Sequence, residues 1–152
     1  MGVDIARLEA AIPADTQMLL DTAPLIAYLE GGQKITPAVK VLMDAWVHDG
    51  RNTALISVIS ASELLVGPKR AGRGEADVVD FLKHYPNVMC IDVDFAIAQD
   101  AAQLRASTKL KMPDALIIAT GASRGAGAIV TNDRAWTTLC PSLPIVTLGD
   151  FV

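Results

Sequence analysis

The chain has 152 residues, of which 51% are hydrophobic and 20% are charged, and its formal net charge is −4. This balance is typical of one soluble globular domain, and the negative charge excludes general coating of nucleic acid while leaving room for a local basic surface. No apolar run reaches the ~18 residues of a membrane-spanning helix, and residues 1–13 lack the apolar core of a signal peptide. We therefore expect a cytoplasmic protein with no membrane association.

The N-terminal segment predicts a short amphipathic helix. Ile5, Leu8 and Ile12 share one helical face, and Pro13 ends the pattern. We interpret residues 1–16 as an extension that packs on the rest of the chain, and residues 17–152 as the main domain.

From residue 17 onward, strand patterns alternate with helical patterns. In chain order we expect a strand at 17–20, a helix at 23–30, a helix opened by Thr36 and Pro37, and a strand at 53–58. Next come a short helix that ends at Gly67-Pro68, a loop at 68–75, a helix at 75–85 and a strand at 88–93. The remaining elements are helices at 94–107 and 113–123, a strand at 128–131, a turn or short helix at 132–139 and a strand at 144–148. This alternation predicts an α/β fold with a mainly parallel sheet.

Four carboxylates occupy corresponding places in this pattern. Asp21 directly follows the first strand, Glu63 lies in the first turn after the second, and Asp133 comes two residues after the fourth. Asp114 opens the helix that precedes the fourth strand. Because ligands bind at the carboxyl ends of parallel strands, we expect the four side chains to gather at one edge of the sheet.

Each acid also has a purely structural explanation. Asp21 could cap the following helix, and Asp114 suits the positive first turn of its helix. Ser60 and Glu63 fit the S-x-x-E capping box, and Asp133 suits a turn. Taken one at a time, these explanations compete well with a functional role.

Taken together, four acids at one edge would repel one another, and burial would raise their pKa values. A bound divalent cation removes this conflict, and oxygen ligands suit Mg²⁺ or Mn²⁺. A zinc site is not expected: Cys90 and Cys140 lie among apolar neighbours and are predicted to be buried thiols, while His48 and His84 are predicted to lie at the surface.

Four segments carry a resemblance to a known family. MLLDTAPLIAYL, ISVISASELLVG, KMPDALIIATG and IVTND resemble, in order and spacing, the four acidic motifs of PIN-domain ribonucleases. The chain length and the segment PDALIIAT are most similar to the VapC-type toxins of toxin–antitoxin pairs. The resemblance covers about residues 17–150. One departure is Ala23, which stands where the family often has a small polar residue.

The resemblance implies a three-layer α/β/α fold and an endoribonuclease that uses one or two Mg²⁺ or Mn²⁺ ions. It implies catalytic and metal-binding roles for Asp21, Glu63, Asp114 and Asp133, supported by Thr22, Thr131 and Asn132. The cations expected to hold the RNA backbone are Lys69, Arg70, Arg73, Lys109, Lys111 and Arg134. The implied partners are an RNA substrate, a cognate antitoxin protein and a second copy of the chain in a homodimer.

Two alternatives stay open. Residues 120–127, TGASRGAG, match the phosphate loop of short-chain dehydrogenases, and a strand at 115–119 would favour that interpretation. The overlapping GASRG is not a hydrolase motif here, because both histidines precede Ser123. The second alternative is a non-catalytic PIN-like module that binds RNA or protein, although the presence of all four acids argues against it.

Overall fold

Five strands form one parallel sheet in the order β3-β2-β1-β4-β5 in the computed structural model, which describes residues 2–152. The strands are β1 (Gln17–Leu20), β2 (Thr53–Ser57), β3 (Val88–Ile91), β4 (Ala128–Thr131) and β5 (Ile145–Thr147). Every neighbouring pair is parallel, so the predicted sheet is confirmed.

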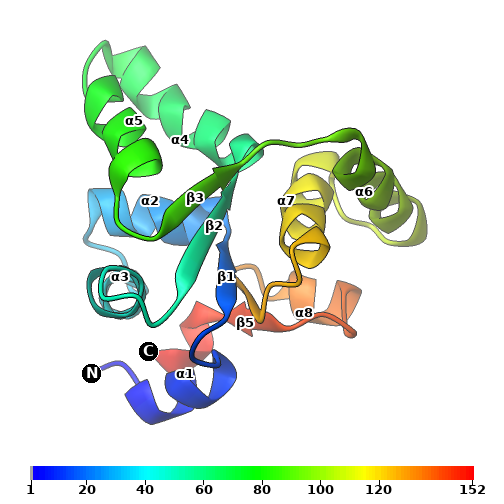
Figure 1. Cartoon of the computed structure of the whole chain (residues 1–152), viewed down its shortest axis with the longest axis horizontal. Coiled ribbons are helices and arrows are strands. Elements are labelled where there is room, and N and C mark those ends of the chain that lie inside the picture. Colours follow the sequence, from blue (N-terminus) through cyan, green and yellow to red (C-terminus); the bar gives the residue numbers. More distant parts are fainter. Residues whose placement is uncertain (1) are drawn as a thin grey trace.

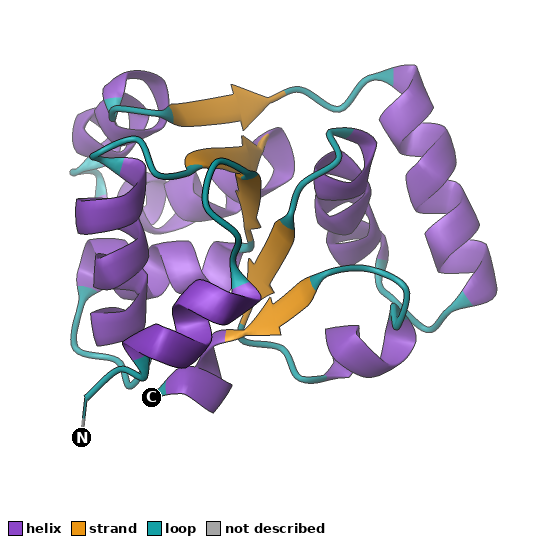
Figure 2. Cartoon of the chain, turned by 60° about the horizontal axis from the view of Figure 1, so that its bottom comes forward, coloured by secondary structure: helices purple, strands orange, loops and turns teal. Residues whose placement is uncertain are grey.

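Helices cover both faces of this sheet (Figures 1 and 2). The helices are α1 (Ile5–Ala11), α2 (Thr22–Glu30), α3 (Thr36–Lys40), α4 (Val58–Ala71), α5 (Glu75–His84), α6 (Phe95–Ser107), α7 (Met112–Ser123) and α8 (Ala135–Leu139). A π-helix, η1 (Val41–Val47), continues α3, and a 3-10 helix, η2 (Leu148–Phe151), follows β5. None of the described helices is long and apolar enough to cross a membrane.

Successive strand side chains enter two different cores, as the period of two in a β-strand requires. On β1, Met18 and Leu20 pack with residues of α1 to α5, whereas Leu19 packs with residues of α6, α7 and α8. All three side chains are fully buried. The sheet therefore has a core on each face, which confirms the three-layer α/β/α architecture.

The strand order changes direction at β1. The chain runs from β1 through β2 to β3 on one side and then returns to place β4 on the other side of β1. In such sheets, ligands bind above the carboxyl ends of the two strands at this switch point. Asp21 follows β1 and Asp133 follows β4, so two of the four acids lie at this crevice.

Helix α4 differs from the sequence prediction at both ends. It begins at Val58, where the Ser57 side chain accepts a 3.1 Å hydrogen bond from the N–H of Ile59. The capping-box interpretation of Ser60 and Glu63 is therefore wrong, because both residues lie inside the helix.

The predicted end of that helix and the loop at 68–75 are also wrong. Helix α4 continues through Gly67 and Pro68 and closes at Gly72, which has φ +70° and donates its N–H to the carbonyl of Pro68. A left-handed glycine is a common helix end. The helix continues past Pro68 although an interior proline removes one hydrogen bond and costs about 3 kcal/mol.

Residues 115–119 are helical, so the dehydrogenase interpretation of TGASRGAG is wrong. Gly121 instead allows α7 to approach the sheet. A Cβ atom at Gly121 would lie 2.9 Å from Cβ of Leu19 on β1, which is closer than packed atoms tolerate. The absence of a side chain at Gly121 lets α7 pack closely against β1.

The two cysteines differ in exposure. Cys140 is buried as predicted, but Cys90 is exposed, so its predicted burial is wrong. The reason is the strand order, which places β3 at the edge of the sheet.

Candidate functional site

Asp21 is the buried member of the acid group, with 8% of its surface exposed. Its Oδ1 accepts a 2.7 Å hydrogen bond from the N–H of Thr22, and its Oδ2 accepts a 2.8 Å hydrogen bond from the hydroxyl of Thr131. Burial raises the pKa of Asp21 to about 6, because desolvation outweighs these two hydrogen bonds, and the charges of Asp114 and Glu63 raise it further.

Glu63 is held by the residue that follows Asp21. The hydroxyl of Thr22 donates a 2.7 Å hydrogen bond to Oε1 of Glu63 and lies 2.9 Å from Oγ of Ser60. Ser60 is fully buried and was not predicted as a site residue. Its spacing of three residues from Glu63 is the signal that could have identified it, because such residues share a helix face.

Asp114 lies in the first turn of α7, half-buried, and the N-cap residue Lys111 makes no side-chain capping bond. Burial raises the pKa of Asp114, as do the charges of Asp133 and Glu63, while Lys111 lowers it. Asp133 is exposed and accepts a 3.0 Å hydrogen bond from the N–H of Ala135.

The four acids therefore act on one another through their charges. Within residues 2–152, no three Asp, Glu, His or Cys side chains are grouped closely enough to hold one ion as they stand. The donors at this edge are carboxylate and hydroxyl oxygens, a set that fits Mg²⁺ or Mn²⁺ and not Zn²⁺. Asp21 is fixed by its two partners. The exposed carboxylates of Glu63 and Asp133 each accept one hydrogen bond through a single oxygen, from Thr22 and Ala135, and the second oxygen of each is left for an ion.

Two of the predicted cations lie beside the acids. Lys109 and Lys111 line a cavity of about 210 Å³ together with Asp114, Asp133 and Trp136. Cations at this place reduce the repulsion between the carboxylates and a phosphate backbone.

The other predicted cations are placed differently. Lys69 and Arg70 lie in the last turn of α4, and Lys69 pairs with Glu75 at 2.6 Å. Arg73 follows the helix end, and Glu63 is separated from Arg70 by seven residues, or about 10 Å along the helix.

Asn132 and Arg134 contact the C-terminal turn. Oδ1 of Asn132 accepts a 3.1 Å hydrogen bond from the N–H of Gly149, and Arg134 forms an ion pair with Asp150. The support predicted from Asn132 thus reaches η2, while Thr22 and Thr131 contact the acids directly.

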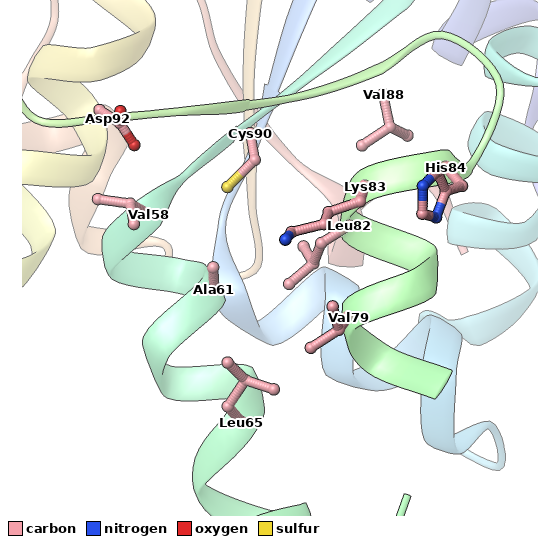
Figure 3. A pocket seen from close by; sticks show the side chains of 10 residues that line it. All are labelled: Val58, Ala61, Leu65, Val79, Leu82, Lys83, His84, Val88, Cys90 and Asp92. Carbon is pink, nitrogen blue, oxygen red and sulfur yellow. The ribbon is translucent and has the colours of Figure 1, made fainter. Parts of the chain in front are cut away.

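A larger cavity of about 680 Å³ lies between α4, α5 and β3 (Figure 3). Its wall is mainly apolar, with Val58, Ala61 and Leu65 from α4 facing Val79 and Leu82 from α5. None of the four acids lines it, so the candidate chemistry lies elsewhere.

Both histidines lie at the surface, as predicted. His84 lies 3.0 Å from Asp80, and His48 lies 3.0 Å from Asp49. Neither histidine lies in the acid group.

Comparisons with known proteins identify the family and the fold. The family model of the PIN domain matches residues 18–140. No curated protein matches the chain.

Several solved structures share the fold. A toxin–antitoxin complex from Klebsiella pneumoniae has 27% identity and a TM-score of 0.67, covering 86% of this chain and 97% of its own. DNA-bound VapBC from Salmonella typhimurium has 19% identity and a TM-score of 0.64, covering 88% and 98%. A VapC toxin from Mycobacterium tuberculosis, described as cleaving the sarcin–ricin loop, has 16% identity and a TM-score of 0.63, covering 81% and 95%. The chain therefore belongs to the PIN-domain family, whose members include nucleases.

Proposed function

We propose that this protein is a divalent-metal-dependent endoribonuclease and the toxin of a toxin–antitoxin pair. The observation that carries the proposal is the group of four acids above the switch point between β1 and β4, two of which are held by threonine hydroxyls. The toxins and toxin–antitoxin complexes among the solved structures support the biological role, and the description of the Mycobacterium tuberculosis toxin supports RNA as the substrate.

The acids and their partners have separate tasks in this proposal. Thr22 and Thr131 fix the orientation of Asp21, and Thr22 also fixes Glu63. Asp21, Glu63, Asp114 and Asp133 would hold Mg²⁺ or Mn²⁺, which supplies charge stabilisation at the scissile phosphate and activates water for attack. Lys109 and Lys111 bind the substrate backbone beside the acids.

A protein inhibitor fits the surface around this edge. Val58 directly follows β2, Phe95 begins α6 after β3, and Met112 begins α7; they are 37%, 78% and 44% exposed. An antitoxin seated on these residues would bury apolar surface and block access to the acids. Co-expression of the partner gene product should restore the growth of cells that produce this chain.

We also propose a homodimer. The edge strand β3 carries Met89, which is 43% exposed, and an unpaired edge with apolar residues favours self-association. Light scattering should give twice the monomer mass, and Met89→Lys should lower it. A monomer at high protein concentration contradicts this point.

The central test is cleavage of single-stranded RNA after treatment with EDTA. We expect the wild type to lose cleavage in the chelator and to recover it when Mg²⁺ or Mn²⁺ is added. The Asp21→Asn variant should not recover cleavage with either ion. Undiminished cleavage in excess EDTA would overturn the metal dependence. RNA binding without cleavage under every metal condition would instead favour the non-catalytic PIN-like module.

A further inference from the structure

A second, polar cavity of about 310 Å³ adjoins the acid site. Gln33 and Lys34 line it from the loop between α2 and α3, Asn132 and Arg134 from the loop after β4, and Gly149 from η2. This volume is at the lower end of the range for small-ligand pockets, which is about 300–1,000 Å³.

The cavity and the acid site share one wall. Asn132 and Arg134 line the polar cavity, whereas Asp133 and Ala135 line the 210 Å³ cavity that also contains Asp114. Alternate residues of the segment 132–135 thus line two neighbouring cavities. An RNA strand that crosses this segment would pass from one cavity to the other.

The charge of the polar cavity is positive. Lys34 is exposed and forms no ion pair within residues 2–152. Arg134 pairs with Asp150, but its side chain keeps 68% of its surface exposed. Because a guanidinium has five N–H donors, Arg134 can hold Asp150 and still donate to a second anion.

The walls of the cavity are fixed by internal hydrogen bonds. The hydroxyl of Thr36 accepts a 3.1 Å bond from the N–H of Gln33 and donates a 2.8 Å bond to the carbonyl of Ala27. This closes the loop that carries Lys34.

The opposite wall is held through the N-terminal helix. The carbonyl of Asp150 accepts a 3.0 Å bond from Nη1 of Arg7, whose guanidinium lies 5.1 Å from the centre of the Phe151 ring. The α1 segment therefore supports the turn that holds Arg134. The backbone on both sides of the cavity therefore needs little ordering on binding, which favours affinity.

We propose that this cavity binds a phosphate of the RNA backbone next to the scissile phosphate. Lys34 and Arg134 supply the charge, and the amide groups of Gln33 and Asn132 supply further donors. Helix α1 and Asp150 act as positioning elements for Arg134. The inference rests on the proposed function, because it assumes that RNA crosses the acid site.

The test measures binding of a fluorescent single-stranded RNA in EDTA, so that binding is separated from cleavage. We expect Lys34→Gln and Arg134→Gln each to lower the affinity about tenfold, as the loss of one charged hydrogen bond predicts. The salt dependence should also weaken, by about 0.7 in the slope of log affinity against log salt for each lost contact. The matched control is Arg124→Gln, at the end of α7 opposite Asp114, which removes the same charge away from both cavities.

A further variant changes the space and not the charge. A Cβ atom at Gly149 would lie 3.0 Å from Oδ1 of Asn132 and 3.2 Å from Nη2 of Arg134. Gly149→Ala should therefore displace both side chains slightly and weaken RNA binding, with a melting temperature close to that of the wild type.

The outcomes separate the two proposals. If the wild type cleaves RNA but Lys34→Gln and Arg134→Gln bind RNA as tightly as the Arg124→Gln control, the inference is wrong and the proposed function stands. If the wild type neither binds nor cleaves RNA, both are wrong. A selective loss of affinity in the cavity variants supports the inference even where cleavage has not been detected.

Discussion

Thr131 joins the acids that follow the two strands at the switch point. Its hydroxyl donates a 2.8 Å hydrogen bond to Oδ2 of Asp21 and accepts a 3.0 Å hydrogen bond from the N–H of Asp133. The side chain is fully buried, so neither bond competes with water. One hydroxyl thus sets the orientation of Asp21 and the course of the loop that carries Asp133.

We predict that Thr131→Val weakens Mn²⁺ binding and RNA cleavage by about 10- to 100-fold, the usual cost of losing a partner of a metal ligand. The matched control is Thr147→Val, because Thr147 is the neighbour of Thr131 on β5 and is also buried. Thermal melts with and without Mn²⁺ measure the effect. Equal losses in the two variants would show that Thr131 has only a packing role.

The pH dependence of stability should report the burial of Asp21. In the metal-free protein its pKa is raised from 3.8 to about 6, so the native state holds a proton that the unfolded state releases. Stability should therefore fall as the pH rises from about 4 to about 6, by roughly 3 kcal/mol from this group, and stay level above that range.

The measurement is the free energy of unfolding of the wild type minus that of Asp21→Asn, determined across this pH range in EDTA. The variant lacks the titrating group, so the carboxylates that do not interact with Asp21 cancel in the difference. A difference that does not change with pH would contradict the buried, protonated state of Asp21. Excess Mn²⁺ should oppose the fall, because the cation favours the ionised form.

Gly121 and Gly67 should respond to the same substitution with different magnitudes. Gly121→Ala places a Cβ atom 2.9 Å from Cβ of Leu19, and overpacking of this kind typically costs about 1–3 kcal/mol. Gly67 lies inside α4 with nothing within 4 Å of an added Cβ outside its chain neighbours. The gain of about 0.5–1 kcal/mol in helix propensity is opposed by the clash of a Cβ with the ring of Pro68, so Gly67→Ala should change stability by less than about 1 kcal/mol. Urea unfolding of both variants tests this pair, and stabilisation by Gly121→Ala would contradict the close approach of α7.

The strands and the convergence of the acids were predictable, because a short buried strand followed by a polar residue is a local pattern. The ends of α4 were not, since Ser57 and Ser60 are both good caps and both Gly67 and Gly72 can end a helix. The local sequence does not show which of these serines and which of these glycines has the more favourable tertiary contacts.

Features that depend on strand order or on distant partners were also beyond the sequence. The exposure of Cys90 follows from the edge position of β3, which no local pattern encodes. The cavity that Lys34 lines could not be predicted either, because the residues that share it, Asn132, Arg134 and Gly149, are about a hundred positions away along the chain.

The N-terminal helix should contribute to stability although it lies outside the matched PIN region. Leu8 is fully buried in the core formed by α1 to α5, so Leu8→Ala should cost about 2–5 kcal/mol. Ile5, on the same helix, is 39% exposed, and Ile5→Ala should cost much less. Chemical denaturation compares the two, and equal small effects would indicate that α1 does not pack as described.

The final prediction concerns Asp114. Asparagine preserves the size and turn preference of aspartate but lacks the charge that a divalent cation requires. If Asp114 only starts α7, Asp114→Asn should cost at most about 1 kcal/mol from the helix-dipole interaction and leave cleavage unchanged.

As a ligand, Asp114 carries a charge that Asp133 and Glu63 repel in the metal-free protein, and burial penalises that charge as well. Removing it should then keep or raise the melting temperature in EDTA. The rate of RNA cleavage should fall at least about a hundredfold. The rise in melting temperature that Mn²⁺ causes in the wild type should be mostly lost.

The matched control is Asp94→Asn. Asp94 caps α6 by accepting a 2.8 Å hydrogen bond from the N–H of Ile97, a role that asparagine fills equally well. We expect this control to melt and cleave as the wild type does, in EDTA and in Mn²⁺. If Asp114→Asn matched this control in both assays, Asp114 would be only a helix-start residue. We expect instead that Asp114→Asn has a higher melting temperature in EDTA and little cleavage, because three other carboxylates share its edge of the sheet.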